Sequence, residues 1–360
     1  MRVLQVDSGR EWRGGQNQVR LLCRELAGRA ELQNRMFTRG GSQLARRAEE
    51  AGVSVHRAEW RSGLSLSAFL ALGRVVGNYR PDIIHAHDSH ALTLALWLRR
   101  LGPKWFAEHK ATGAADANPY VVIGHRRVDF HVKSANWRRA DRVIAVSEGV
   151  KRVLVQDGLD PRDVVVIPDG IDPDEIRANA QQAPDIRMRL GLPAHLPLAV
   201  NAAALVDHKD HETLIRAAAR ARARAPQLHW VIAGEGPRHD ALQREIANQS
   251  VGDIVHLVGY VEPVDALIRE ASVFVMSSRE EGMGSVVLQA LALAKPVVAT
   301  AAGGLPEIVP SEWLAPVGDA EVLAAKTIQA LNHPVRVPLD PRFTAKSMAE
   351  ATLAQYRLLA

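Results

Sequence analysis

Short apolar segments alternate with helix-like segments along almost the whole chain, and this alternation limits the possible folds more than any other feature. The stretch "RVLQVDS" precedes the amphipathic "QNQVRLLCRELAGR", "DIIHAHD" precedes "SHALTLALWLRRL", and "RVIAVS" precedes "EGVKRVLVQDG". Parallel strands need long crossover connections, and these are usually helices. The order therefore predicts a parallel sheet with helices on both of its faces.

The same pattern starts a second time in the C-terminal half. After "VVVIPDGIDPDEIRANAQQAPD" it resumes at "LPLAVNAAAL", near Leu196, and continues through "LHWVIAG", "IVHLVG", "VFVMSS" and "PVVAT". The chain has 360 residues, of which 47% are hydrophobic, enough for two cores. We predict an α/β protein with two doubly wound, Rossmann-like domains, residues 1–170 and 171–342. The Pro- and Asp-rich stretch between Pro168 and Pro193 marks the linker. Ligands bind at the carboxyl ends of such strands, so we expect the two domains to face a cleft.

The composition excludes several classes of protein. No apolar run reaches the roughly 18 residues of a membrane-spanning helix, and the charged opening "MRVLQVDSGREWRGG" is unlike a signal peptide. A cytoplasmic location is expected. Cys23 is the single cysteine, which rules out an internal disulfide and a cysteine zinc cluster. Its apolar spacing with Val19, Leu22 and Leu26 predicts a role in packing.

Basic residues are concentrated in the N-terminal half of the chain. The formal charge is +5, from 45 Lys and Arg against 40 Asp and Glu. Two interpretations of the richest stretch, "GHRRVDFHVKSANWRRADR", stay open. It is either a solvated face or a contact with anionic lipid on the inner face of a membrane, which contributes about 1 kcal/mol per basic residue. Nucleic acid is not expected as a partner, because no binding motif is present. The basic residues of this cluster are Arg126, Arg127, Lys133, Arg138, Arg139 and Arg142.

Glycines follow two of the predicted strands. Gly14 and Gly15 lie between the first strand and its helix, and Gly234 opens the sequence "GEGP" after a later strand. Glycines at a helix N-terminus expose backbone amides that can bind a phosphate. A tight strand-to-helix turn would have the same sequence, so both interpretations remain open.

Histidines crowd the end of the predicted fourth strand. The motif "HAHDSH" contains His85 and His87, which alternation places on one side of the strand, followed by Asp88. A metal site that includes Asp88 or His109 is one interpretation. A polar histidine that faces the cleft is the simpler one, because no further histidine or acidic pair stands at ligand spacing. We therefore predict no metal.

A longer run of sequence resembles a known family. The stretch "SSREEGMGSVVLQALALAKPVVATAAGGLPEIV", residues 277–309, is similar to the signature of the bacterial family 4 retaining glycosyltransferases of the GT-B fold. That signature is Glu-Gly-x-Gly, a helix, Lys-Pro-Val-Val-Ala-Thr and Gly-Gly-x-Pro-Glu. Further similar pieces cover nearly the whole chain: "GGQNQVRLLCREL", "PDIIHAHD", "RRADRVIAVSEGVKRVLVQDG", "VIPDGID", "VDHKDHETLIRAAA" and "FTAKSMAEATLAQYRLL".

The resemblance implies a GT-B enzyme with an N-terminal acceptor-binding domain, to which a helix at residues 343–360 returns, and a C-terminal nucleotide-sugar-binding domain. The expected donor is a nucleotide diphosphosugar, most simply a UDP-sugar. The expected reaction is transfer to a saccharide or lipid-linked acceptor with retention of configuration, without a metal or other cofactor, in lipopolysaccharide or other surface-glycan biosynthesis. Two alternatives stay open: an epimerase of the same fold, and a sugar-nucleotide-binding protein without activity.

The resemblance also assigns roles to residues. The catalytic residues are His87 near the reacting sugar, Glu281 at the donor sugar hydroxyls and Lys209 at the diphosphate. Apart from the resemblance, we expect acceptor or membrane contacts at His109, Arg126, Arg127, Arg138 and Arg139, the last four of which lie in the basic stretch. The expected donor-binding residues are Gly15, Gly234, Met283, Gly284, Ser285, Val286 and Gln289.

The sequence departs from the family pattern at two places. Gln289 stands where the family usually has a second Glu, and an amide can still hydrogen-bond to ribose hydroxyls. Ala203 and Ala204 stand where an Arg usually precedes the phosphate lysine, so a fixed charge is missing from the leaving-group site. His208 or Arg279 could supply a substitute, but their spacing does not decide between them.

Overall fold

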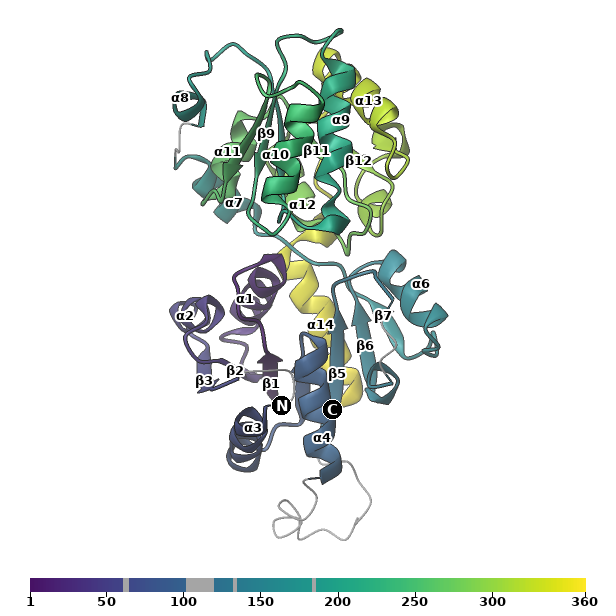
Figure 1. The fold of residues 1–360 in the computed structure, drawn as a ribbon. Helices are drawn as coiled ribbons and strands as arrows, with labels where there is room; N and C mark the ends of the chain where they lie inside the picture. The colour runs from purple at the N-terminus through teal and green to yellow at the C-terminus, as the bar shows by residue number, and fades with distance from the viewer. Residues whose placement is uncertain (61–64, 102–119, 132–134, 183–185) are drawn as a thin grey trace. The chain divides into compact units, whose positions relative to one another are not determined.

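The computed structural model describes residues 1–60, 65–101, 120–131, 135–182 and 186–360 (Figure 1). The chain divides into two compact units. Unit 1 consists of Met1–Gly170 and Thr344–Ala360, and unit 2 consists of Ile171–Phe343. Each unit has its own parallel sheet with helices packed against it. The predicted α/β class with two Rossmann-like parallel sheets is confirmed.

Unit 1 contains a seven-stranded sheet. Its strands are β1 (Arg2–Asp7), β2 (Gln33–Arg39), β3 (Ser54–Ala58), β4 (Ile83–Ala86), β5 (Val121–Arg126), β6 (Arg142–Ala145) and β7 (Val164–Val166). They pair in parallel in the order β3-β2-β1-β4-β5-β6-β7. Its helices are α1 (Gly14–Leu26), α2 (Gln43–Glu50), α3 (Leu66–Tyr79), α4 (Ser89–Leu101), the short η2 (Trp137–Arg139), α6 (Glu148–Gln156) and α14 (Ala345–Leu359).

Unit 2 contains a six-stranded sheet. Its strands are β8 (Leu198–Ala202), β9 (His229–Ala233), β10 (Val255–Gly259), β11 (Val273–Met276), β12 (Val297–Thr300) and β13 (Leu314–Ala315). They pair in parallel in the order β10-β9-β8-β11-β12-β13. Its helices are α7 (Pro173–Ala180), α8 (Ile186–Leu190), α9 (His211–Ala221), α10 (His239–Asn248), α11 (Val264–Glu270), α12 (Ser285–Ala292) and α13 (Ala320–Asn332). Short 3-10 turns are η3 (Asp207–Lys209), η4 (Leu305–Glu307), η5 (Ser311–Trp313) and η6 (Pro341–Phe343).

The helices of unit 2 form two groups. Helix α9 packs against α10 and α13, whereas α11 packs against α7 and α12. From β8 the chain adds β9 and β10 on one side and β11, β12 and β13 on the other. Because the crossovers between parallel strands are right-handed, the two directions place the two groups of helices on opposite faces of the sheet. The carboxyl ends of the strands then lie at one edge, and the loops that follow β8, β9, β11 and β12 meet there.

The stretch expected to be a linker contains helix α7. The Asp172 carboxylate accepts hydrogen bonds from the amides of Asp174 and Glu175, and Pro173 occupies the first turn. An aspartate cap followed by proline favours the start of a helix. Ile176 is buried where α7 packs against α11 and α12. This segment is therefore part of unit 2.

Helix α14 completes the core of unit 1, although all of unit 2 precedes it in the sequence. It packs against α1, and its Leu353 and Tyr356 are fully buried in one cluster with Val3 and Ile83. Cys23 lies in a neighbouring buried cluster, so its predicted role in packing is confirmed. No helix in the described part of the chain is long and apolar enough to cross a membrane.

We expect Leu353→Ala to lower the free energy of unfolding by about 2–5 kcal/mol, because it removes apolar contacts and leaves a cavity in the core of unit 1. Urea denaturation followed by circular dichroism measures this change. Leu358→Ala on the same helix is the matched control, since that side chain is 69% exposed, and it should change stability by less than about 0.5 kcal/mol. Equal denaturation midpoints for the two variants would contradict the assignment of α14 to the core.

Candidate active site

Three histidines lie at the carboxyl ends of adjacent strands in unit 1. His85 is in β4, His87 follows it directly, and His125 is in β5. The ring centroids of His85 and His87 are 4.3 Å apart, and those of His85 and His125 are 5.3 Å apart. Parallel pairing of β4 with β5 brings the two strand ends to the same edge. The crowding predicted from "HAHDSH" thus includes a third histidine that sequence reasoning did not single out.

Arg127, the residue after β5, connects this histidine cluster to Asp169, near the end of the first segment of unit 1. Its Nη1 lies 3.3 Å from His87 Nδ1 and its Nη2 lies 3.1 Å from His125 Nδ1. Its Nε donates to Asp169 Oδ1 at 3.1 Å. The arginine side chain is only 10% exposed. Near the same place, a side chain on Gly15 of α1 would contact Arg127 Cδ at 3.9 Å.

A second set of hydrogen bonds joins the cluster to α14. His87 Nε2 lies 2.8 Å from Gln5 Oε1, and Gln5 Nε2 donates to the Tyr356 hydroxyl at 3.1 Å. The same hydroxyl lies 2.6 Å from His85 Nδ1. Both ring nitrogens of His87, the residue expected near the reacting sugar, are therefore engaged inside unit 1.

Burial controls the charge of these groups. It lowers the pKa of His85, His87 and His125 well below the usual value, and the positive charge of Arg127 lowers each pKa further. The three imidazoles are neutral at pH 7. Asp7 at the end of β1 behaves in the opposite sense, because burial and then the nearby charge of Asp88 raise its pKa to about 7. Desolvation disfavours the charged form in both cases.

The three histidines do not fit a metal ion. Their potential ligand atoms lie within 4.8 Å of one another, but the rings of His85 and His125 are stacked at an interplanar angle of 5°. The nitrogen lone pairs of two stacked rings lie in separate, nearly parallel planes, whereas a metal needs ligands whose lone pairs converge on one point. The guanidinium of Arg127 also opposes a cation at this place.

The basic cluster predicted for acceptor or membrane binding does not form a single surface. Arg126 is 6% exposed. Its guanidinium lies 5.1 Å from the centroid of the Phe130 ring and 5.3 Å from that of Trp137, and it donates to the Val128 and Phe130 carbonyls. Membrane contact through Arg126 and Arg127 is therefore wrong, because aromatic packing and the histidine cluster hold these two side chains inside unit 1. Arg138 and Arg139 are exposed. His109 and Lys133 lie outside the described residues.

The structure brings together the two residues predicted to be catalytic in unit 2. Lys209 Nζ donates to Glu281 Oε2 at 2.5 Å, and Ser278 Oγ donates to the same oxygen at 3.1 Å. The two side chains are 16% and 11% exposed. An ammonium and a carboxylate that are both largely desolvated attract each other more strongly than a surface pair.

Backbone contacts fix the turn that carries Glu281. The Gly304 amide donates to the Glu281 carbonyl at 3.0 Å, and the Arg279 amide donates to the His208 carbonyl at 2.8 Å. Ser277 Oγ donates to the Lys209 carbonyl at 3.0 Å. The loops after β8, β11 and β12 are thereby joined, so Lys209, Glu281 and the second glycine loop keep their relative places.

Helix α12 begins directly after this turn. Gly284 caps it in the left-handed conformation, with φ of 83°, and a Cβ there would lie 2.7 Å from Leu305 Cδ2. The first intrahelical hydrogen bond runs from the Val287 amide to the Gly284 carbonyl, so the Ser285 and Val286 amides precede it. The first turn contains no acidic residue. Such a helix end favours an anion. Met283, also predicted to bind the donor, is buried.

The glycines of "GEGP" are needed for close packing. A Cβ on Gly234 would lie 1.9 Å from the Ala203 carbonyl oxygen, and one on Gly236 would lie 2.4 Å from the Leu205 carbonyl oxygen. The loop after β9 thus packs on the backbone of the loop after β8. The tight turn considered for Gly234 from the sequence is present.

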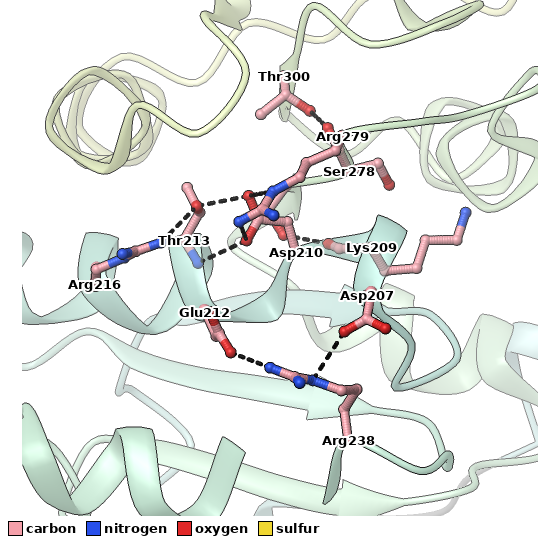
Figure 2. A network of polar contacts seen from close by, with 11 residues as sticks. Asp207, Lys209, Asp210, Glu212, Thr213, Arg216, Arg238, Ser278, Arg279 and Thr300 are labelled. Carbon is pink, nitrogen blue, oxygen red and sulfur yellow. Dashed lines mark hydrogen bonds and ion pairs between the residues drawn. The ribbon is translucent and has the colours of Figure 1, made fainter. Parts of the chain in front are cut away.

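Two arginines, Arg238 and Arg279, lie on loops near Lys209 (Figure 2). The resemblance had led us to expect an arginine where the sequence has Ala203 and Ala204. Arg279 makes hydrogen bonds of 2.8 Å and 3.0 Å to the two carboxylate oxygens of Asp210. Arg238 forms ion pairs with Asp207 at 3.2 Å and with Glu212. Each guanidinium is therefore held by carboxylates. Both arginines lie near Lys209, but the negative charge of their carboxylate partners offsets their positive charge.

Gln289 has a partner that the sequence did not reveal. Its Nε2 donates to Asp265 Oδ1 at 2.8 Å, and Asn179 Nδ2 donates to Asp265 Oδ2 at 3.1 Å. Asp265 is 4% exposed, and burial raises its pKa to about 6. The carboxylate joins α7, α11 and α12. The one sign of this role in the sequence is that Asp265 is an acidic residue inside the apolar stretch "VDALI".

Comparisons with known proteins identify related families. Residues 12–175 match the family model described as Glycosyltransferase Family 4, and residues 197–333 match Glycosyl transferases group 1. A putative colanic acid biosynthesis glycosyltransferase, WcaL of Salmonella typhimurium, is 27% identical over 73% of this chain and 64% of its own length. A lipopolysaccharide core biosynthesis glycosyltransferase, LpsE of Rhizobium meliloti, is 25% identical over 76% of this chain and 74% of its own.

Solved structures show the same fold. HepE of Anabaena, crystallised with UDP and glucose, superposes with a TM-score of 0.79 at 17% identity, over 99% of this chain and 100% of that one. The lipopolysaccharide outer core galactosyltransferase WaaB, in its apo form, has a TM-score of 0.70 at 13% identity. The chain has the GT-B fold and combines a Glycosyltransferase Family 4 domain in its N-terminal half with a Glycosyl transferases group 1 domain in its C-terminal half.

Proposed function

We propose that the protein transfers a sugar from a nucleotide diphosphosugar, in the simplest case a UDP-sugar, to a saccharide or lipid-linked acceptor with retention of configuration. The observation that carries the proposal is the pairing of Lys209 with Glu281 beside the N-terminus of α12. A cation and a helix N-terminus suit a diphosphate. A neighbouring carboxylate suits sugar hydroxyls and the positive charge that develops at the anomeric carbon.

The relatives support a role in surface-glycan synthesis. Those named above act, by their descriptions, in colanic acid and lipopolysaccharide core biosynthesis, and HepE was crystallised with UDP and glucose. Because these named relatives are glycosyltransferases, they do not favour an epimerase. A binding protein without activity is not favoured either, because the named relatives are described as glycosyltransferases.

Within this proposal the donor changes the partners of Lys209. The diphosphate attracts the ammonium, which leaves the Glu281 carboxylate available to the sugar. The amides of Ser285 and Val286 add partial positive charge to the same group. Stabilisation of the leaving diphosphate then needs no divalent ion, because fixed dipoles and one ammonium supply the charge.

Incubation of the purified protein with a panel of nucleotide sugars and a lipid-linked saccharide, in excess EDTA, tests this proposal. We expect one donor to release its nucleotide and the acceptor to gain a sugar, with the anomeric configuration of the product read by NMR. Release of the nucleotide without a glycosylated acceptor would mean that the protein only hydrolyses the donor. Conversion of the donor sugar into its epimer would indicate an epimerase. Activity that disappears with EDTA and returns with a divalent ion would contradict metal independence.

Glu281 and Gln289 should affect different kinetic parameters. Glu281→Gln removes the carboxylate that faces the developing positive charge, so we expect kcat to fall by about 100-fold. Because Gln289 Nε2 is already bonded to Asp265, we propose that its amide oxygen accepts from a ribose hydroxyl of the donor. Gln289→Ala removes this neutral hydrogen bond, so we expect donor KM to rise by roughly 2- to 12-fold with kcat preserved. Steady-state kinetics at saturating acceptor measures both. The assignment is reversed if Gln289→Ala abolishes turnover while Glu281→Gln retains it.

We expect contact with a membrane to depend on Arg138 and Arg139, since both are exposed. We propose peripheral binding to the anionic cytoplasmic face of the inner membrane. Wild-type protein should sediment with anionic vesicles at low salt and leave them as salt rises. Serine at both positions should weaken binding by roughly 30-fold, from about 1 kcal/mol per residue. Arg162→Ser, at a side chain that is 88% exposed, is the control. Equal binding to neutral vesicles would rule out electrostatic attachment.

A further inference from the structure

The contacts of Arg127 determine where two histidines carry their protons. Its guanidinium contacts the Nδ1 atoms of His87 and His125. A guanidinium has five N–H donors and no acceptor. Each of these Nδ1 atoms must therefore accept a hydrogen bond, which requires a lone pair and excludes a proton at that position.

The remaining proton of each ring must then lie on Nε2. Burial, followed by the charges of Arg127 and of the neighbouring histidines, lowers the pKa of both His87 and His125 well below the usual value, so both rings are neutral at pH 7. A neutral imidazole carries one proton. With Nδ1 unprotonated, both rings are Nε2–H tautomers.

The hydrogen bonds beyond His87 run in one direction as a consequence. His87 Nε2–H donates to Gln5 Oε1, which leaves the Gln5 amino group to donate to Asn34 Oδ1 at 3.0 Å and to the Tyr356 hydroxyl. The hydroxyl, having accepted from Gln5, can donate its own proton to His85 Nδ1. All of these contacts lie within unit 1, and Arg127 sets their direction.

We propose that Arg127 is a positioning residue that holds His87 and His125 as Nε2–H tautomers, so that His125 offers an N–H donor to an oxygen atom of the substrate. His125 Nε2 is buried and has no hydrogen-bond partner among the described residues. An unpartnered buried donor is costly unless a ligand satisfies it. The role toward substrate rests on the proposed function, whereas the tautomers do not.

Asp169 holds Arg127 in the required orientation. Asp169 is buried, and its carboxylate accepts from Arg127 Nε, which directs the two Nη groups toward the rings. The next residue is also fixed, because the Gly170 amide donates to Gln18 Oε1 at 3.0 Å. A Cβ on Gly170 would lie 2.4 Å from the Thr344 carbonyl oxygen. Asp169, which holds Arg127, therefore lies in closely packed backbone, next to the point where unit 1 ends at Gly170 and resumes at Thr344.

NMR of protein labelled with ¹⁵N in its histidine rings tests the tautomers directly at pH 7. We expect the long-range ¹H–¹⁵N pattern of the Nε2–H form for His87 and His125, with signals assigned by their loss in His87→Gln and His125→Gln. A proton on Nδ1 of either ring in the wild-type protein would overturn the proposal. This measurement needs no substrate, so it remains decisive even if no nucleotide sugar is turned over, which would instead defeat the proposed function.

Arg127→Met tests whether the arginine sets the tautomers. We expect His87 and His125 to populate both forms in this variant, and kcat to fall by roughly 10- to 100-fold while donor KM changes less than about threefold, as expected for loss of a charge-assisted hydrogen bond that orients a catalytic group. Arg162→Met is the control and should leave the spectrum and turnover unchanged. Unchanged tautomers, or changed tautomers with full kcat, would each overturn the positioning role. If Arg127→Met does not fold, the wild-type spectrum still decides.

Discussion

Parallel strand pairing is the constraint on which the rest of the structure depends. Each parallel sheet directs the carboxyl ends of its strands to one edge, and only loops can follow there. In unit 1 this edge gathers the histidines of β4 and β5, and in unit 2 it gathers Lys209 and Glu281 from the loops after β8 and β11. Residues distant in sequence become neighbours because their strands end together.

Each of the two sheet edges contains a largely buried cation, and the groups that stabilise the cation differ between the two units. In unit 1 the Arg127 guanidinium is matched by one carboxylate and two neutral imidazoles. In unit 2 Lys209 is matched by Glu281. Unmatched charges would be expensive in either place. Within the proposed function, a diphosphate donor replaces Glu281 as the partner of Lys209 without leaving the ammonium unpaired, so donor binding would exchange one ion pair for another.

The fold could be predicted from the sequence because it depends on repeated local patterns. Alternating apolar strands and amphipathic helices gave two parallel sheets, and the crowding of His85 and His87 followed from strand alternation. Asp169 and Asp265 were not identified, because each acquires its role through a partner far away in sequence: Arg127 lies 42 residues from Asp169 and Asn179 lies 86 residues from Asp265. His125 was not identified because only the pairing of β5 with β4 brings it beside His85. Arg126 was misread for a similar reason, since charge alone does not reveal that Phe130 and Trp137 enclose it.

The resemblance leads us to expect an arginine where the sequence has Ala203 and Ala204, and the structure shows how the charges around these residues are arranged. The Ala203 carbonyl lies so close to Gly234 that a Cβ there would approach to 1.9 Å, and the nearby Arg279 and Arg238 are already paired with Asp210, Asp207 and Glu212. A compensated pair releases little net charge to a ligand. Lys209 is then the principal side-chain cation we assign to the diphosphate. Within the proposed function, the α12 dipole, aided by the glycine that starts the helix, supplies the remaining stabilisation.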